Sequence, residues 1–206
     1  MDANRTADLQ LGVRIEDITV AWMVVEMAVA LGAGIAAGSV LLAAFGIDSL
    51  IEIVSGAVLL WRLRVESRGG ELEKVEVAEK RATWIVAVTL GLLSIYVLVT
   101  AISGLVAQSK PESSPLGIAV SAAALLFMPY LAVTKRRIAK RIDSDALAAD
   151  AANSITCAYM AGTVLVGLLL NILFGWWWVE DVAALLFLIW LVRETWEAFE
   201  EARASG

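Results

Sequence analysis

Two carboxylates one helical turn apart are the residues of this sequence best suited to chemistry. Asp48 and Glu52 lie in the segment Ser39–Glu52, SVLLAAFGIDSLIE, whose other side chains are mostly apolar. Residues four apart share one face of a helix, so both acids point in the same direction. An acid near the centre of a membrane-spanning helix costs about 3 kcal/mol, and two on one face indicate a functional site by default. The pattern therefore predicts a cation site.

The composition is typical of an integral membrane protein. The chain has 206 residues, of which 60% are hydrophobic and 18% charged, with a mean hydropathy of +0.77. A soluble domain is about 45–50% apolar and about 25% charged. There is no histidine, which removes the commonest metal ligand and the usual proton switch near neutral pH. We expect a single transmembrane domain over residues 1–206 in a bacterial inner membrane.

Six apolar segments predict an all-α bundle of six transmembrane helices. The predicted spans are 18–37, 40–61, 82–106, 116–133, 147–170 and 176–196. Of the 16 Lys and Arg residues, all but Lys110 fall in segments that an even number of spans places on one side. The positive-inside rule then puts both termini in the cytoplasm. The stretch 62–81 is expected to be a solvated loop with a helical end, and the tail after the sixth span is too short to bury a core.

No basic residue falls inside the first five predicted spans, and the sixth contains only Arg193, near its end. The cluster that follows the fourth span is expected on the cytoplasmic side and contains Lys135, Arg136, Arg137, Lys140 and Arg141. Asp48 and Glu52 therefore have no expected internal ion-pair partner, which favours a bound cation over a structural acid pair.

An internal repeat provides the two acids with a partner helix. A shift of 105 residues lays Ser39–Glu52 over Ser144–Cys157, with five of fourteen positions identical. Asp48 then falls on Asn153 and Glu52 on Cys157, so both helices carry a polar pair at i and i+4. Two repeats that each supply a polar helix to a midplane site are a common plan in transporters. Two carboxylates, an amide oxygen and a thiolate would form a four-coordinate metal site of mixed hardness.

Nearly the whole chain resembles the transmembrane part of the cation diffusion facilitator family, also called cation efflux proteins. The resemblance lies in Gly38-Ser39-Val40-Leu41-Leu42-Ala43 before Asp48 and Glu52, Ala149-Asp150 before Asn153 and Cys157, Trp177-Trp178-Val179-Glu180-Asp181, and Trp196-Glu197-Ala198. It implies a six-helix exporter of divalent metals, usually a homodimer, that exchanges the metal for protons. It also implies a transport site made by pairs on the second and fifth helices, here Asp48, Glu52, Asn153 and Cys157.

This sequence departs from the family pattern at half of that site. The family usually has Asp where this chain has Glu52, and His or Asp followed by Asp where it has Asn153 and Cys157. The cytoplasmic metal-binding domain that usually follows the sixth helix has no counterpart in these residues, so a dimer is expected to pair through its membrane helices. A thiolate favours Zn²⁺ and then Cd²⁺, whereas the oxygen ligands leave Fe²⁺, Co²⁺ and Mn²⁺ open. No prosthetic group is expected.

Other acids are possible transport-path residues. Glu26 could belong to the site, carry protons, or accept a hydrogen bond from another helix. Asp150, one turn before Asn153, could be a further ligand, support the ligands, or line the access path. Glu180 and Asp181 are expected at the outer interface, where acids cost little.

The leading hypothesis is proton-coupled export of Zn²⁺ or Cd²⁺ by alternating access. One alternative is a proton-coupled exporter of organic cations, which predicts aromatic side chains facing the acids. Another is a membrane metal sensor or partner subunit that does not transport. An enzyme is not expected because the sequence contains no nucleophile–base constellation or phosphate-binding loop, and nucleic-acid binding is not expected because the basic residues follow the topology.

Overall fold

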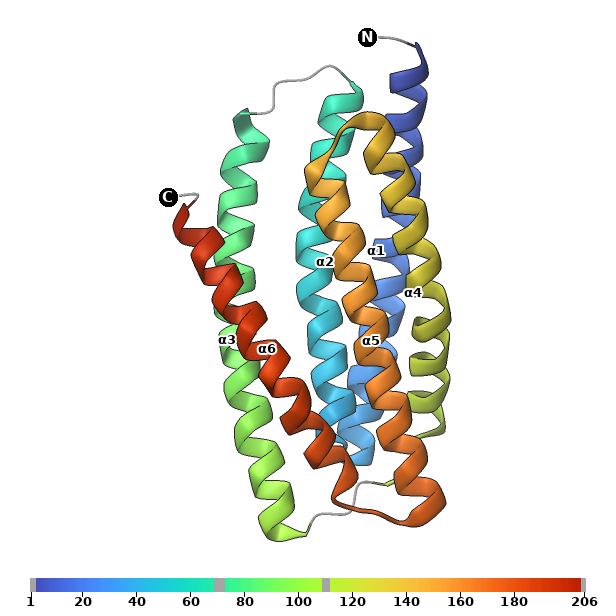
Figure 1. Cartoon of the computed structure of the whole chain (residues 1–206), viewed down its shortest axis with the longest axis vertical. Helices are drawn as coiled ribbons and strands as arrows, with labels where there is room; N and C mark the ends of the chain where they lie inside the picture. Colours follow the sequence, from blue (N-terminus) through green and yellow to red (C-terminus); the bar gives the residue numbers. More distant parts are fainter. Residues whose placement is uncertain (1–2, 69–72, 109–111, 205–206) are drawn as a thin grey trace.

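The computed structural model is a bundle of six α-helices (Figure 1). It describes residues 3–68, 73–108 and 112–204. The helices in chain order are α1 (Ala3–Ala37), α2 (Val40–Ser67), α3 (Glu73–Ala107), α4 (Pro115–Ile142), α5 (Asp145–Phe174) and α6 (Val179–Ala204). The all-helical architecture confirms the predicted fold class.

The helices extend well beyond the predicted spans. α1 begins at Ala3 rather than near residue 18, and α2 and α4 have 28 residues each. At 1.5 Å per residue such a helix is about 42 Å long, which exceeds a hydrocarbon core of about 30 Å. The expected loop 62–81 is mostly helical, because α2 continues to Ser67 and α3 begins at Glu73. Its predicted break at Gly69 and Gly70 lies outside the described residues.

Within the described residues, the five helices α1 to α5 are long and apolar enough to cross a membrane. α6 is more charged, because Glu180 and Asp181 lie near its start and Arg193 and Glu194 near its end, which leaves the uncharged stretch 182–192. It packs mainly against α3 and crosses the bundle at an incline (Figure 1).

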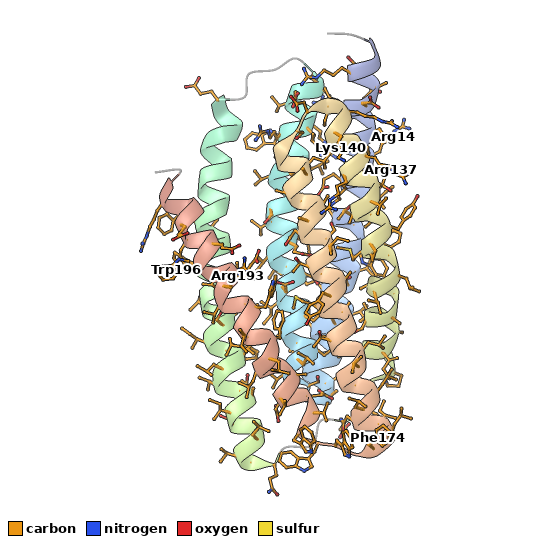
Figure 2. All side chains as sticks on the ribbon, in the orientation of Figure 1. Arg14, Arg137, Lys140, Phe174, Arg193 and Trp196 are labelled. Atoms are coloured by element: carbon orange, nitrogen blue, oxygen red, sulfur yellow. The ribbon has the colours of Figure 1, made fainter. Side chains whose placement is uncertain are left out.

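The ends of the bundle differ in character. Both chain termini lie in its upper part (Figure 1). Figure 2 shows Arg14, Arg137 and Lys140 near that same end and Phe174 at the opposite end. The Phe174 ring stacks on Trp176, with 5.0 Å between the centroids. Basic residues at one end and aromatic rings at the other are the distribution expected for a cytoplasmic and an outer side.

Three helix pairs make the most extensive contacts, namely α1 with α2, α4 with α5, and α3 with α6. The α1–α2 pair is close because glycines lie at the contact. A Cβ atom on Gly34 would lie 2.5 Å from the Ala43 nitrogen, and one on Gly46 would lie 2.6 Å from the Leu31 nitrogen. Small residues that let backbones approach are typical of helix association in membranes. This contact sets the position of α2 against α1.

Candidate functional site

Serine caps begin the two helices that carry the predicted site. The Ser39 Oγ accepts a hydrogen bond from the Leu42 nitrogen at 3.2 Å, and α2 starts after it. The Ser144 Oγ accepts one from the Leu147 nitrogen at 3.3 Å, and α5 starts after it. A serine in this role satisfies a backbone N–H that has no partner within the helix. The 105-residue register therefore aligns two helix starts, which supports the repeat.

Asp48 and Glu52 lie side by side on the buried face of α2. Each residue is only 5% exposed. The Glu52 Oε2 has no hydrogen-bond partner among the described residues. A buried carboxylate oxygen without a partner is costly unless a ligand or ion satisfies it.

α2 and α5 run in opposite directions, so the two polar pairs do not meet residue for residue. α2 begins at the lower end of the bundle in Figure 1 and α5 at the upper end. On α2, Glu52 is one turn nearer the end of the bundle that carries Arg14 and Arg137 than Asp48 is. On α5, Asn153 is one turn nearer that end than Cys157, and one turn is about 5.4 Å.

The structure brings Cys157 to the α2 acids, whereas Asn153 makes no hydrogen bond with them. The Cys157 side chain is fully buried and lies near the Glu52 carboxylate. Asn153 is half-buried and makes no side-chain hydrogen bond to another described residue. Three of the four predicted ligands thus lie near one another.

Glu26 of α1 makes hydrogen bonds to side chains of both α2 and α5. Its Oε1 accepts hydrogen bonds from the Ser49 Oγ at 2.8 Å and from the Cys157 Sγ at 3.4 Å. Its Oε2 accepts one from the Trp22 indole Nε1 at 2.7 Å. Of the roles left open for Glu26, hydrogen bonding to other helices is confirmed, because Ser49 lies on α2 and Cys157 on α5.

The side chains of Glu26, Asp48, Glu52 and Cys157 form what we call the central acidic cluster. Glu26 and Asp48 both lie near Glu52, and all three carboxyl groups lie near Cys157. Glu194 of α6 adds a further negative charge close enough to act on Asp48. The sequence reasoning did not single out Glu194, because it lies among other charges at the end of a predicted span.

The central acidic cluster does not have the geometry of a bound metal ion. Across the described ranges, no three Cys, Asp or Glu side chains converge closely enough to hold one, and the sequence has no histidine. Its contacts are hydrogen bonds such as the 3.4 Å contact from Cys157 to Glu26, whereas a Zn–S bond is about 2.3 Å. Binding a metal would require these side chains to close together and to give up those hydrogen bonds.

Lys135, the first residue of the basic cluster after the fourth predicted span, points into the bundle and does not face solvent. It is fully buried within α4. Its Nζ lies 3.0 Å from the Glu16 Oε2, contacts the Asp150 Oδ2, and donates to the Ser154 Oγ at 3.5 Å. Neither Glu16 oxygen meets the geometry of a hydrogen bond with a described residue, so that contact is a charge pair. Asp150, considered as a transport-path residue, has Lys135 as its ion-pair partner.

A periodic signal for these buried charges is present in the sequence. Lys135 continues a stripe of buried residues on α4 spaced three and four apart, which comprises Met128, Leu131, Ile138 and Ile142. Glu16 and Glu26 lie on the corresponding stripe of α1 with Thr19 and Met23. Residues at this spacing face the core of a bundle. The hydrophobic windows alone missed Glu16 and Lys135, because the first predicted span began after Glu16 and the fourth ended before Lys135.

Glu180 and Asp181 are buried rather than exposed at an interface. The Glu180 carboxylate is 2% exposed and accepts hydrogen bonds from the Ser39 Oγ at 2.5 Å and the Asn171 Nδ2 at 3.2 Å. Asp181 is 4% exposed, and its Oδ2 has no hydrogen-bond partner among the described residues. The first turn of α6 accounts for part of this, because a helix N-terminus stabilises carboxylates. Glu180 thereby links α6 to the start of α2 and the end of α5.

Residues 18–205 match the cation efflux transmembrane domain. The chain belongs to the cation efflux family. The predicted resemblance is therefore confirmed over almost the whole chain, and α6 lies inside the matched range. Membership in this family also confirms that the chain is a membrane transport domain and not an enzyme.

An uncharacterized transporter of Synechocystis sp. is a curated protein similar to this chain. It is 26% identical over 179 residues, which cover 82% of this chain and 58% of that protein. The chain thus spans less than two thirds of its relative's length. The family match does not test which side chains bind the cation, so Asp48, Glu52, Asn153 and Cys157 remain predicted ligands.

Proposed function

We propose that this cation efflux family protein exports a divalent metal ion from the cytoplasm in exchange for protons. The observation behind the proposal is the buried pair Asp48 and Glu52, each 5% exposed, which faces Cys157 inside a membrane bundle. No described Lys or Arg forms an ion pair with either acid. Buried charges without a partner favour binding a mobile cation.

The ligand types favour Zn²⁺, with Cd²⁺ next. A thiolate at Cys157 is a soft ligand, which suits both ions, whereas carboxylates also accommodate Fe²⁺, Co²⁺ and Mn²⁺. The ion would enter from the cytoplasm and bind between α2 and α5. Protons from the outer side would then neutralise the carboxylates and release it outward. Since the chain has no histidine, the carboxylates and Cys157 must take up those protons.

The proposal also covers the membrane location and the oligomeric state of the protein. We place it in a bacterial inner membrane, as a homodimer whose contacts are made by transmembrane helices.

Export of an organic cation is the second candidate, and one feature favours it. A surface hollow of about 500 Å³ is lined by Trp22, Ala123, Leu126, Phe127 and Tyr130. Trp22 also contacts Glu26, so an aromatic surface adjoins the central acidic cluster. The contact is made by the indole N–H and not by the ring face that would attract a cation, so we rank metal export first.

Flux through purified protein in liposomes tests the proposal. The protein is inserted inside-out, so that its cytoplasmic face points outward, the liposome lumen is acidic, and Zn²⁺ is added to the outer solution. We expect Zn²⁺ uptake into the lumen that stops when the pH gradient is dissipated. Asp48→Asn should abolish uptake, whereas the exposed Glu197→Gln should leave it unchanged. Full uptake by Asp48→Asn, or an absence of flux for every divalent metal, would refute metal export. Uptake of an organic cation in place of metals would establish the second candidate.

A further inference from the structure

We propose that an anionic phospholipid binds on the surface of the bundle between α1 and α4. Its phosphate would lie at the basic patch, which we define as Arg14, Arg137 and Lys140. One of its acyl chains would lie in the hollow lined by Trp22, Ala123, Leu126, Phe127 and Tyr130. The central acidic cluster is buried, whereas this site is on the surface, so the inference is independent of the proposed export of metal.

The packing of α1 against α4 brings the basic patch together. The two helices run in opposite directions (Figure 1). A Cβ atom on Gly12 would lie 3.6 Å from the Ile138 Cγ2, so these two residues are at the same level of the bundle. Arg14 is two residues further along α1, and Arg137 is the residue before Ile138 on α4. Figure 2 shows Arg14, Arg137 and Lys140 at this one end of the bundle.

The three side chains of the basic patch are exposed and have no carboxylate partner. None of them forms an ion pair or a side-chain hydrogen bond with another residue that the structure describes. Other arginines near this end of the bundle do have partners, namely Arg5 with Glu66, Arg64 with Asp17 and Arg141 with Asp8. Three positive charges thus remain for an anion from outside the chain.

The basic patch lies at the depth of lipid headgroups. Arg137 and Lys140 follow the first residue of α4, Pro115, by 22 and 25 residues, and Arg14 precedes the last residue of α1, Ala37, by 23 residues. At 1.5 Å per residue, these positions are about 33 to 38 Å from the opposite ends of their helices. A hydrocarbon core is about 30 Å thick, and the headgroups extend the bilayer to about 40–45 Å. The patch is therefore level with the phosphates of one leaflet.

The hollow lies on the same face of α4 as Arg137. Tyr130, Leu126 and Ala123 precede Arg137 by 7, 11 and 14 residues, and each of these spacings returns to nearly the same side of a helix. Leu126 is 78% exposed and Tyr130 is 65% exposed, so this face is open to the membrane. Tyr130 is two turns, about 10 Å, deeper in the bilayer than Arg137. A single lipid that lies along the helix axis would reach both the patch and the hollow.

The hollow suits a hydrocarbon chain. Its volume is about 500 Å³, and none of its five lining side chains is charged. Its two helices meet where the ring of Trp22 packs edge-on against the ring of Phe127, with 5.2 Å between the centroids. The polar N–H of Trp22 is directed away to Glu26, at 2.7 Å. Apolar surface therefore adjoins the three cations, which is the chemistry of a phospholipid chain and headgroup.

The charge of the basic patch favours an anionic lipid over a zwitterionic one. Guanidinium groups bind phosphate oxygens through paired hydrogen bonds, and clusters of basic residues at the membrane surface are typical sites for anionic headgroups. In phosphatidylcholine the phosphate carries its own cationic group, which Arg14, Arg137 and Lys140 would repel. Phosphatidylglycerol has no such group.

Lipid binding to the purified, delipidated full-length protein tests the inference. Native mass spectrometry compares phosphatidylglycerol with phosphatidylcholine that has the same acyl chains. We expect phosphatidylglycerol to bind at least about tenfold more tightly, and the combined variant Arg14→Gln, Arg137→Gln, Lys140→Gln to reduce this preference to about threefold or less. Because the three side chains are exposed, this variant should keep the wild-type unfolding temperature in lipid-free detergent.

Three further measurements separate the parts of the site. The matched control removes three arginines that have carboxylate partners and should keep the preference (Arg5→Gln, Arg64→Gln, Arg193→Gln). Ala123→Phe fills part of the hollow without changing any charge, so we expect it to weaken phosphatidylglycerol binding about threefold or more. Glycerol phosphate, which has the phosphate and no acyl chain, should not displace the lipid at equal concentration.

Several outcomes would overturn the inference. Equal affinity for the two lipids, or an unchanged preference in the combined variant, would exclude the basic patch as a headgroup site. Full affinity in Ala123→Phe, or displacement of the lipid by glycerol phosphate, would show that the patch binds a phosphate without the hollow. Efficient disulfide cross-linking between copies that carry Tyr130→Cys would show that a second copy of the chain, and not a lipid, covers this face.

Discussion

The Lys135 ammonium lies 3.0 Å from the Glu16 carboxylate, and both side chains are fully buried. The same ammonium contacts Asp150, so one cation joins α4 to α1 and α5. This network lies on the cytoplasmic side of the central acidic cluster, and the charge of Asp150 is close enough to act on Glu52. The chain therefore holds two kinds of buried acid, one paired with its own lysine and the other without such a partner.

Removing the lysine should be strongly destabilising. Lys135→Met leaves two buried carboxylates without a counter-charge, and breaking such a pair typically costs about 3–5 kcal/mol. We expect a marked fall in the thermal unfolding temperature in detergent, with part of the loss recovered when Glu16→Gln and Asp150→Asn are added. The neighbouring exposed Arg136→Met is the control and should have little effect. Equal stability of the two single variants would show that the network does not stabilise the fold.

The α1–α2 contact should tolerate a methyl group at one glycine and not at another. A Cβ on Gly46 would lie 2.6 Å from the Leu31 nitrogen, whereas one on Gly32 has no other atom within 4 Å. Gly46→Ala should therefore cost about 1–3 kcal/mol through overpacking. Gly32→Ala should be neutral or stabilising by up to about 1 kcal/mol, because alanine favours the helix. Thermal melts of both variants measure the difference, and similar melts would contradict the close approach.

The two capping serines should differ in their importance. Ser144→Ala loses only a helix cap, worth about 1 kcal/mol. Ser39→Ala loses the same cap and also the hydrogen bond to the buried Glu180 carboxylate, and a bond to a charged group contributes about 1.5–3 kcal/mol. We expect Ser39→Ala to be the less stable variant in thermal unfolding. The reverse order would indicate that the Ser39–Glu180 contact contributes nothing.

Replacing the thiol should change the metal preference. Cys157→Ala removes the soft ligand, so we expect Cd²⁺ and Zn²⁺ transport to fall about tenfold relative to Mn²⁺ and Co²⁺. The measurement is competitive uptake into liposomes, with Cys157→Ser as the matched variant that keeps a harder oxygen in the same position. A Cd²⁺ to Mn²⁺ ratio unchanged in both variants would remove Cys157 from the site.

Much of the fold was predictable because the bilayer imposes one-dimensional rules. Long apolar windows, the distribution of basic residues and the i, i+4 spacing of Asp48 and Glu52 depend only on local sequence. They predicted six helices and the shared face of the two acids, and the resemblance of the motifs predicted the family. The capping role of Ser39 and Ser144 shows that the repeat, too, was encoded locally.

Contacts between helices that are distant in sequence depend on the direction of each helix and on its rotation about its own axis, which the composition does not specify. Two matching i, i+4 pairs appear equivalent in an alignment, but the antiparallel course of α2 and α5 reverses the order of the two pairs, and the structure places Cys157 near Glu52. The rotation of α4 turns Lys135 inward, and that of α1 turns Glu26 toward Cys157. The sequence by itself thus determined which helix carries the acids. Only the tertiary structure decided which side chains meet them, because a contact requires both helices to be placed.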